Sequence, residues 1–96
     1  MQISIRYFTT LREITGKKEE KLIFSENKKI TITAVLETLS DKYGKAFTDY
    51  VFNSDEQVKS FLQLLINGTN TTTISGTEAA MQDGDVLAIL PPVGGG

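Results

Sequence analysis

The chain has 96 residues, of which 40% are hydrophobic and 23% charged, a balance that fits one small globular domain with its own core. Its formal net charge of −2, with acids and bases mixed along the chain, argues against a nucleic-acid binder, which would present a basic face. The sequence has neither cysteine nor histidine, which excludes disulfides, a thiolate nucleophile, sulfur-ligated metal and the commonest general base.

The first predicted element is a half-buried strand at residues 2–8, where apolar and polar side chains alternate. Phe8 breaks this alternation, because it is apolar at a position on the polar face. The apolar run is too short for a signal peptide and nothing approaches a transmembrane stretch, so we expect a cytoplasmic protein without a membrane partner. The side chains expected to face the core are Ile3, Ile5 and Tyr7.

A short helix or helical turn is predicted at residues 9–15, closed by Gly16. A second strand should follow at residues 20–25, and the next turn at residues 26–29. The charges of residues 17–21 (KKEEK) cancel except for one lysine, so we interpret this run as a solvated turn.

The strongest helical pattern covers residues 32–43. Thr31 is the expected N-cap of this helix, and Gly44 is the expected stop. The helix should lie across the sheet through an apolar stripe made of Ile32, Val35, Leu36, Leu39 and Tyr43.

Residues 45–60 are the hardest part of the chain to interpret. The apolar residues there favour a short helix packed on the edge, followed by an exposed loop at residues 53–57. The segment 61–66 predicts an apolar strand that ends at the turn signal Asn67-Gly68. The apolar residues of the short helix are Phe47, Tyr50, Val51 and Phe52.

The last predicted strand, residues 86–90, lies between the turn signal Asp83-Gly84-Asp85 and Pro91, which cannot donate to a strand ladder. Because this strand is the most apolar, we expect it inside the sheet beside the first strand. The order of elements favours an α+β fold at residues 1–90, with a mixed four- to five-stranded sheet and one main helix packed on one face.

No conventional active site is evident in the sequence. It contains no Ser-His or Cys-His pair and no phosphate-binding loop, and Asp83 and Asp85 are explained by their tight turn. What is left is the segment 91–96 (PPVGGG), predicted to be an extended, flexible C-terminal tail. The plain interpretation of terminal glycines is slack or an expression scar.

Three features favour a working tail over slack. The prolines hold an extended path directly after the last strand, the glycines lack Cβ and fit a narrow cleft, and the α-carboxylate is unobstructed. An ionised carboxylate is a poor electrophile, so a partner that binds ATP has to activate it. The protein is then a carrier or tag, not an enzyme, with no bound cofactor and with ATP consumed by the partner.

Two segments, ISIRYFTTLREITG near the start and DGDVLAILPPVGGG at the end, resemble the small subunit of molybdopterin synthase and its relatives. These relatives are ubiquitin-like β-grasp proteins that end in Gly-Gly, and they include sulfur carriers and small archaeal modifier proteins. The resemblance covers nearly the whole chain, including LLING at residues 64–68. Many relatives carry Ser, Thr or Ala at the position of Gly94, but the final diglycine is intact.

The resemblance implies a role for each tail residue. Gly96 would be adenylated by an E1-like enzyme, and then converted to a thiocarboxylate or joined to target lysines. Threading into the partner's active site would fall to Gly94 and Gly95. The mouth of the channel would hold Pro91, Pro92 and Val93.

The resemblance also implies a docking surface, because in this family apolar side chains on the outer face of the sheet dock the partner. Alternation along the last strand should turn Leu87 and Ile89 to the core. A scattered surface phenylalanine is the simpler interpretation of Phe8. The expected docking residues are Phe8, Val86, Ala88 and Leu90.

Three functions stay open from the sequence. The first is a sulfur carrier of the molybdopterin synthase type, whose partners are the E1-like enzyme and the synthase large subunit. The second is a modifier joined through Gly96 to lysines of target proteins, and one protein can serve both roles. The third is a plain interaction domain with an idle tail.

Overall fold

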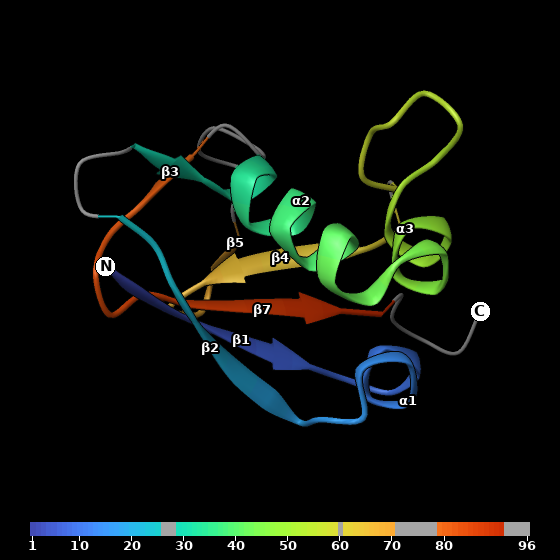
Figure 1. Cartoon of the computed structure of the whole chain (residues 1–96), viewed down its shortest axis with the longest axis horizontal. Coiled ribbons are helices and arrows are strands. Elements are labelled where there is room, and N and C mark those ends of the chain that lie inside the picture. The colour runs from blue at the N-terminus through green and yellow to red at the C-terminus, as the bar shows by residue number, and fades with distance from the viewer. Residues whose placement is uncertain (26–28, 60, 71–78, 92–96) are drawn as a thin grey trace.

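A five-stranded mixed sheet forms one layer of the molecule, and helices cover one of its faces (Figure 1). The structure is a computed structural model that describes residues 1–25, 29–59, 61–70 and 79–91. The central pair, β1 and β7, is parallel, and the other neighbours are antiparallel. In spatial order the strands are β2 (Glu19–Ile23), β1 (Gln2–Tyr7), β7 (Val86–Leu90), β4 (Gln63–Ile66) and β5 (Thr69–Asn70).

The main helix, α2 (Ile32–Tyr43), lies across the sheet and has the predicted boundaries. The Thr31 side chain accepts a hydrogen bond from the Ala34 N–H at 3.2 Å, which satisfies one of the free donors of the first turn. Gly44, with φ 79°, ends the helix in a conformation that a side chain disfavours. Four residues of the predicted stripe are fully buried, namely Ile32, Val35, Leu36 and Leu39.

Two shorter helices flank the same end of the sheet. α1 (Thr10–Thr15) follows β1 and is closed by Gly16 in the left-handed conformation, as predicted. α3 (Lys45–Val51) confirms the short helix, and the exposed loop 53–57 follows it. In the described part of the chain, no helix is long and apolar enough to cross a membrane.

A small antiparallel ribbon of β3 (Ile30–Thr31) and β6 (Ala80–Met81) lies beside the start of α2 and was not predicted. The second strand is shorter than predicted and begins one residue earlier. Of the predicted turn at 26–29 only residue 29 is described, because residues 26–28 lie outside the described ranges.

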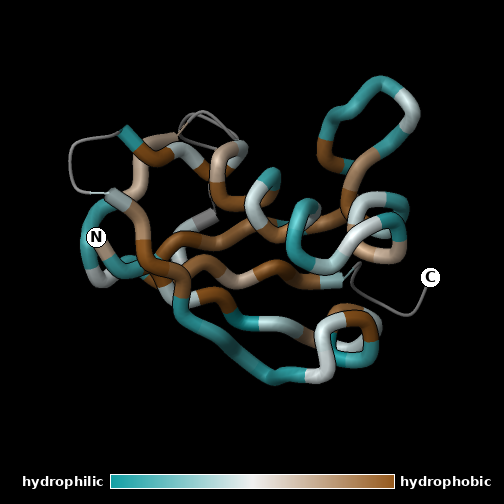
Figure 2. The backbone as a smooth tube through the Cα atoms, in the orientation of Figure 1, coloured by the Kyte–Doolittle hydropathy of each residue, from teal (hydrophilic) through white to brown (hydrophobic). Residues whose placement is uncertain are grey.

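The core lies between the sheet and α2. Alternation along β1 buries Ile3, Ile5 and Tyr7, as the sequence predicts, and leaves Gln2 and Arg6 exposed. Figure 2 shows the hydrophobic strands β4 and β7 in the middle of the molecule, with hydrophilic segments toward the periphery.

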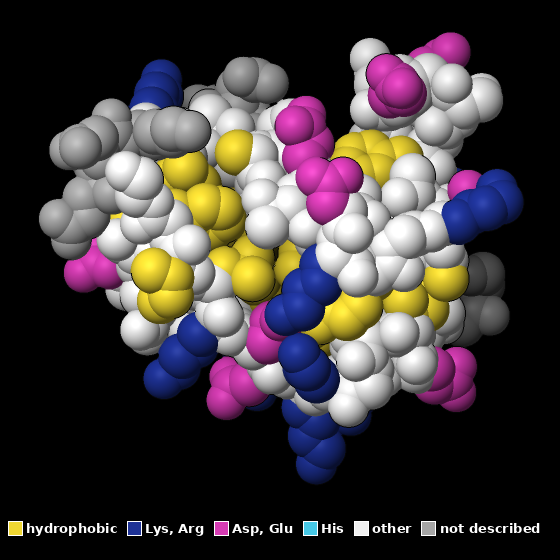
Figure 3. Space-filling view, viewed as in Figure 1, with side chains coloured by type: hydrophobic (Ala, Val, Ile, Leu, Met, Phe, Trp, Pro, Cys, Tyr) yellow, Lys and Arg dark blue, Asp and Glu magenta, His cyan; other side chains and the backbone are white. Residues whose placement is uncertain are grey.

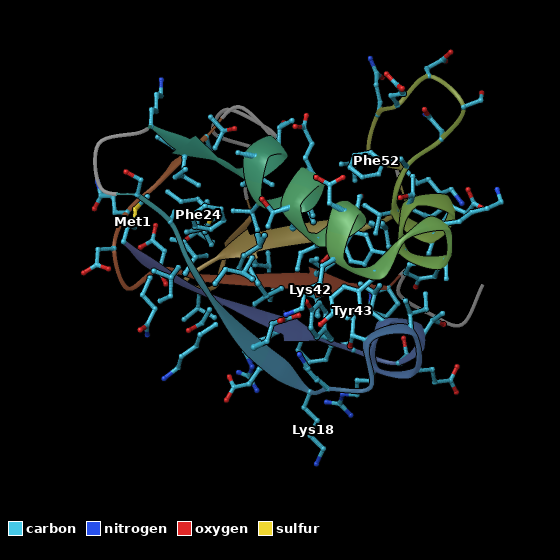
Figure 4. The ribbon with its side chains drawn as sticks, viewed as in Figure 1. Met1, Lys18, Phe24, Lys42, Tyr43 and Phe52 are labelled. Atoms are coloured by element: carbon cyan, nitrogen blue, oxygen red, sulfur yellow. The ribbon has the colours of Figure 1, made fainter. Side chains whose placement is uncertain are left out.

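The prediction of a solvated turn at residues 17–21 is wrong for Glu20, whose side chain is only 6% exposed. Glu20 lies in β2 on the side that faces the core, because alternation sends Glu19 and Lys21 outward instead. Its Oε1 accepts hydrogen bonds from Tyr7 Oη, at 2.5 Å, and from Tyr43 Oη. Its Oε2 accepts one from Lys42 Nζ at 2.6 Å. Figure 4 shows Lys42 and Tyr43 at the end of α2, over the sheet.

The Glu20 carboxylate makes stability depend on pH. Burial alone raises its pKa, but hydrogen bonds from Lys42, Tyr43 and Tyr7 outweigh burial and lower the pKa from 4.5 to about 2. A pKa below its unfolded value gives stability that is present above pH 4.5 and is lost as the pH falls toward 2. The contribution of this shift to the free energy of unfolding is at most about 3 kcal/mol, because solvent screening reduces it.

We expect Glu20→Gln to lower the free energy of unfolding at pH 7 and to flatten its decline between pH 4.5 and 2. Urea unfolding across this pH range measures both effects. Glu19→Gln is the matched control, because Glu19 lies on the same strand but is exposed. If the free energy of unfolding falls equally steeply between pH 4.5 and 2 in wild type and in Glu20→Gln, then Glu20 is not the source of the pH dependence.

Candidate docking surface at the root of the C-terminal segment

The parallel strands β1 and β7 finish at the same end of the sheet. Tyr7, the last residue of β1, pairs with Ile89 of β7, so Phe8, which follows β1, comes next to Leu90, the last residue of β7. Pro91 is half-buried and is the last described residue. The predicted threading and channel positions Pro92, Val93, Gly94 and Gly95, and the reactive Gly96, lie outside the described residues.

Alternation along β7 separates its side chains as predicted. Leu87 and Ile89 are 0% and 1% exposed in the core. Their neighbours Val86, Ala88 and Leu90 are half-buried and fall on the outer face, the one that α2 does not cover. Phe8 is half-buried as well. The structure therefore brings the four predicted docking residues to one face, while their role in docking stays a prediction.

One further apolar residue belongs to this face. Leu65 of β4 pairs with Ala88, so their side chains are cross-strand neighbours on the outer face. Phe61 is 46% exposed in the turn before β4, whose pairing with β7 begins at Gln63. The run FLQLLI is apolar almost throughout and does not reveal its faces; only the register with β7 does. We define the outer-face patch as Phe8, Leu65, Val86, Ala88 and Leu90.

Two guanidinium groups flank the Phe8 ring. The Cζ atoms of Arg6 and Arg12 lie 5.9 and 5.5 Å from its centroid, within cation–π range. Arg12 Nε also donates a hydrogen bond to the Tyr7 carbonyl at 3.1 Å, which ties α1 to the end of β1. The outer-face patch therefore has an apolar centre and a cationic rim, which suits a partner surface with acidic groups.

The turn 83–85 has a structural role. Asp83 Oδ1 accepts the Gln2 N–H at 2.7 Å, and Asp85 Oδ2 accepts the Gln82 N–H at 2.8 Å. The other Asp85 oxygen accepts from Asn67 Nδ2 at 3.0 Å. These bonds hold the turn before β7, in agreement with the sequence interpretation. Among the residues that the structure describes, no cluster of acidic side chains is arranged to hold a metal ion.

The fold defines the class of protein. A mixed sheet with its first and last strands parallel at the centre, crossed by one main helix, is the ubiquitin-like β-grasp, as the sequence predicted. The model of the ThiS family matches residues 5–96, and the chain belongs to this family.

Similar proteins agree with this assignment. Small archaeal modifier protein 3 of Haloferax volcanii is 30% identical over 96 residues, which is the full length of both chains. A putative sulfur carrier protein of Archaeoglobus fulgidus is 29% identical over 68 residues, covering 71% of this chain and 76% of the relative. The solution structure of small archaeal modifier protein 1 from Methanosarcina acetivorans superposes with a TM-score of 0.83 at 31% identity, covering 99% of this chain and 96% of the other.

Proposed function

We propose that this protein is a carrier whose Gly96 carboxylate is adenylated by an E1-like enzyme and converted to a thiocarboxylate. One observation carries this proposal. Phe8 and Leu90 are neighbours on the outer face, directly before the segment that ends in diglycine. The outer-face patch then docks the activating enzyme, while the segment enters its active site. The protein supplies the acyl group and is not itself the catalyst, and it acts in the cytoplasm.

The chemistry needs nothing from the chain except the carboxylate. One Gly96 oxygen attacks the α-phosphorus of ATP, which forms an acyl–phosphate bond and releases pyrophosphate. A sulfide-equivalent nucleophile then attacks the acyl carbon, releases AMP and leaves the thiocarboxylate. Pro91, Pro92 and Val93 lie at the channel mouth in this proposal, and Gly94 and Gly95 thread through it because they lack Cβ.

A second function uses the same acyl-adenylate. A lysine amine of a target protein attacks the acyl carbon, loses a proton and forms an isopeptide bond as AMP leaves. The full-length similarity to a small archaeal modifier protein supports this alternative, whereas the similarity to a putative sulfur carrier supports the first. Both functions require Gly96, and one protein can perform both.

Intact-mass spectrometry distinguishes the products. The protein is incubated with an E1-like enzyme of its own organism, ATP and a sulfide source, and a reaction without ATP serves as the control. A gain equal to the mass difference between sulfur and oxygen indicates the thiocarboxylate. In cells that carry a tagged copy, lysines bearing a C-terminal glycine remnant indicate conjugation. If an enzyme that is active on another carrier yields neither product, the proposal fails.

A further inference from the structure

A hollow of about 420 Å³ opens on the helical side of the molecule, away from the outer-face patch. It lies between α2, the end of α3 and the loop 53–57, which rises beside α2 in Figure 3. Its volume is near the lower end of the roughly 300–1,000 Å³ range of ligand sites. A hollow of this size suits one or two side chains of a peptide better than a folded domain.

The charge of this hollow is one-sided. Of its described lining residues, three are acidic and none is basic; the acidic ones are Glu37, Asp41 and Glu56. Nearby lysines form ion pairs with other acidic residues: Lys42 pairs with Glu20, and Lys45 pairs with Asp49 at 2.8 Å. Lys59 donates to the Asp49 carbonyl at 2.6 Å. The three acidic residues therefore line the hollow without an ion pair to a lysine at these flanking positions.

An aromatic ring and an unused hydroxyl complete the hollow. Phe52 is half-buried at the base of the loop, and Figure 4 shows it facing α2. Such a ring next to carboxylates suits a cationic side chain, which gains a cation–π contact and an ion pair together. Ser40 also lines the hollow, and its buried Oγ has no hydrogen-bond partner in the described structure. A buried hydroxyl without a partner is unusual in a native structure, and this one lies directly under the floor of the hollow.

The wall of the hollow is preorganised. Asn53 Oδ1 accepts hydrogen bonds from the N–H groups of Asp55 and Gln57, at 2.9 and 3.1 Å. A bridge between Phe52 and Val58 closes the base of the loop. The opposite wall is helical and carries Glu37 and Asp41 one turn apart, a like-charge pair that does not stabilise an isolated helix. Local stability therefore does not account for the acidic lining.

We propose that this hollow binds a basic segment of a partner protein, which inserts a lysine or arginine side chain between Phe52 and the α2 carboxylates. The site lies on the helical side of the sheet, opposite the outer-face patch. The outer-face patch and the hollow can therefore be occupied at the same time. A β-grasp carrier with both surfaces can hold a basic partner while an enzyme engages its outer face.

The probe is a fluorescein-labelled peptide of alternating arginine and glycine, titrated into the ¹⁵N-labelled full chain, with a citrulline-for-arginine peptide as the uncharged control. We expect amide shifts confined to α2, Phe52 and the loop 53–57. The double variant Glu37→Gln/Asp41→Asn should raise the dissociation constant by about tenfold. Glu13→Gln/Glu19→Gln makes the same change in net charge at exposed sites elsewhere and should leave it within about twofold.

A second variant distinguishes the cation–π contribution of the Phe52 ring from its hydrophobic contribution. Phe52→Leu keeps a buried hydrocarbon but removes the π face, so it should weaken binding with the fold intact. Equal weakening by both charge variants would overturn the proposal, because it would indicate non-specific attraction. It is also overturned if calcium shifts the same amides at a lower concentration than the peptide does, since the hollow would then be a cation site.

Discussion

Removal of Gly96 is expected to abolish adenylation of the protein. The reacting carboxylate then sits on Gly95, one residue short of the partner's ATP, and a misplacement of even about 1 Å lowers rates by about a hundredfold. The direct measurement is ATP–pyrophosphate exchange catalysed by an E1-like enzyme, with intact mass as a second readout. We expect exchange to fall by at least about a hundredfold and neither thiocarboxylate nor conjugate to form.

One added alanine after Gly96 is the matched control for length. It keeps every native residue but moves the carboxylate outward and adds a Cβ, so it should be as inactive as the truncated protein. Circular dichroism and thermal unfolding should match wild type in both variants, because neither changes a residue of the sheet or the core. An exchange rate near wild type for the truncated protein would support the idle-tail interpretation.

Leu90→Arg is expected to produce the second large effect, on affinity for the activating enzyme. Leu90 is half-buried on the outer face beside Phe8, at the end of the outer-face patch from which the C-terminal segment continues. A buried charge without a partner inside an interface has the effect of losing a hot-spot residue, about 2 kcal/mol or more, which is about 30-fold in affinity. Calorimetric titration of the enzyme with the protein measures this change.

Ile23→Arg supplies the control for Leu90→Arg. Ile23 is 74% exposed on the outer face, but it pairs with Gln2 at the opposite end of the sheet. This variant adds the same charge to the same face, so long-range electrostatics are matched. We expect its affinity to stay within about twofold of wild type, as for most surface substitutions. Equal losses in the two variants would show that the position of the charge is irrelevant and that the outer-face patch is not the docking site.

The sequence predicted those helices and strands whose pattern lies within a single short segment. The boundaries of α2 follow from an apolar stripe, a capping threonine and a terminal glycine, all within one segment. The core side of β1 follows from period-two alternation of apolar and polar residues. β7 is apolar throughout, so its core side was predicted only with the help of the family resemblance. The ribbon of β3 and β6 escaped prediction because two residues a strand are too few to show a period.

Features that depend on residues far away in the chain could not be predicted from the sequence. Glu20 looked solvated because its neighbours are charged, and its burial depends on Tyr7 across the sheet and on Lys42 and Tyr43 at the end of α2. The face on which Leu65 lies became known only from the register of β4 with β7. For Gly96 the situation is the opposite. Its role was inferred from sequence and resemblance alone, because the residue lies outside the described part of the chain.

The central position of β7 has a consequence for folding kinetics. Ser4 of β1 pairs with Val86 of β7, so the middle of the sheet forms only after the chain has closed a loop over most of its length. Without β7, the sheet divides into two hairpins, β1–β2 and β4–β5, and isolated hairpins are marginally stable at best in water. Folding should therefore be close to all-or-none, and slower than in helical domains of similar size. A protease that removes β7 together with the C-terminal segment does not leave a smaller folded protein, but one without a stable sheet.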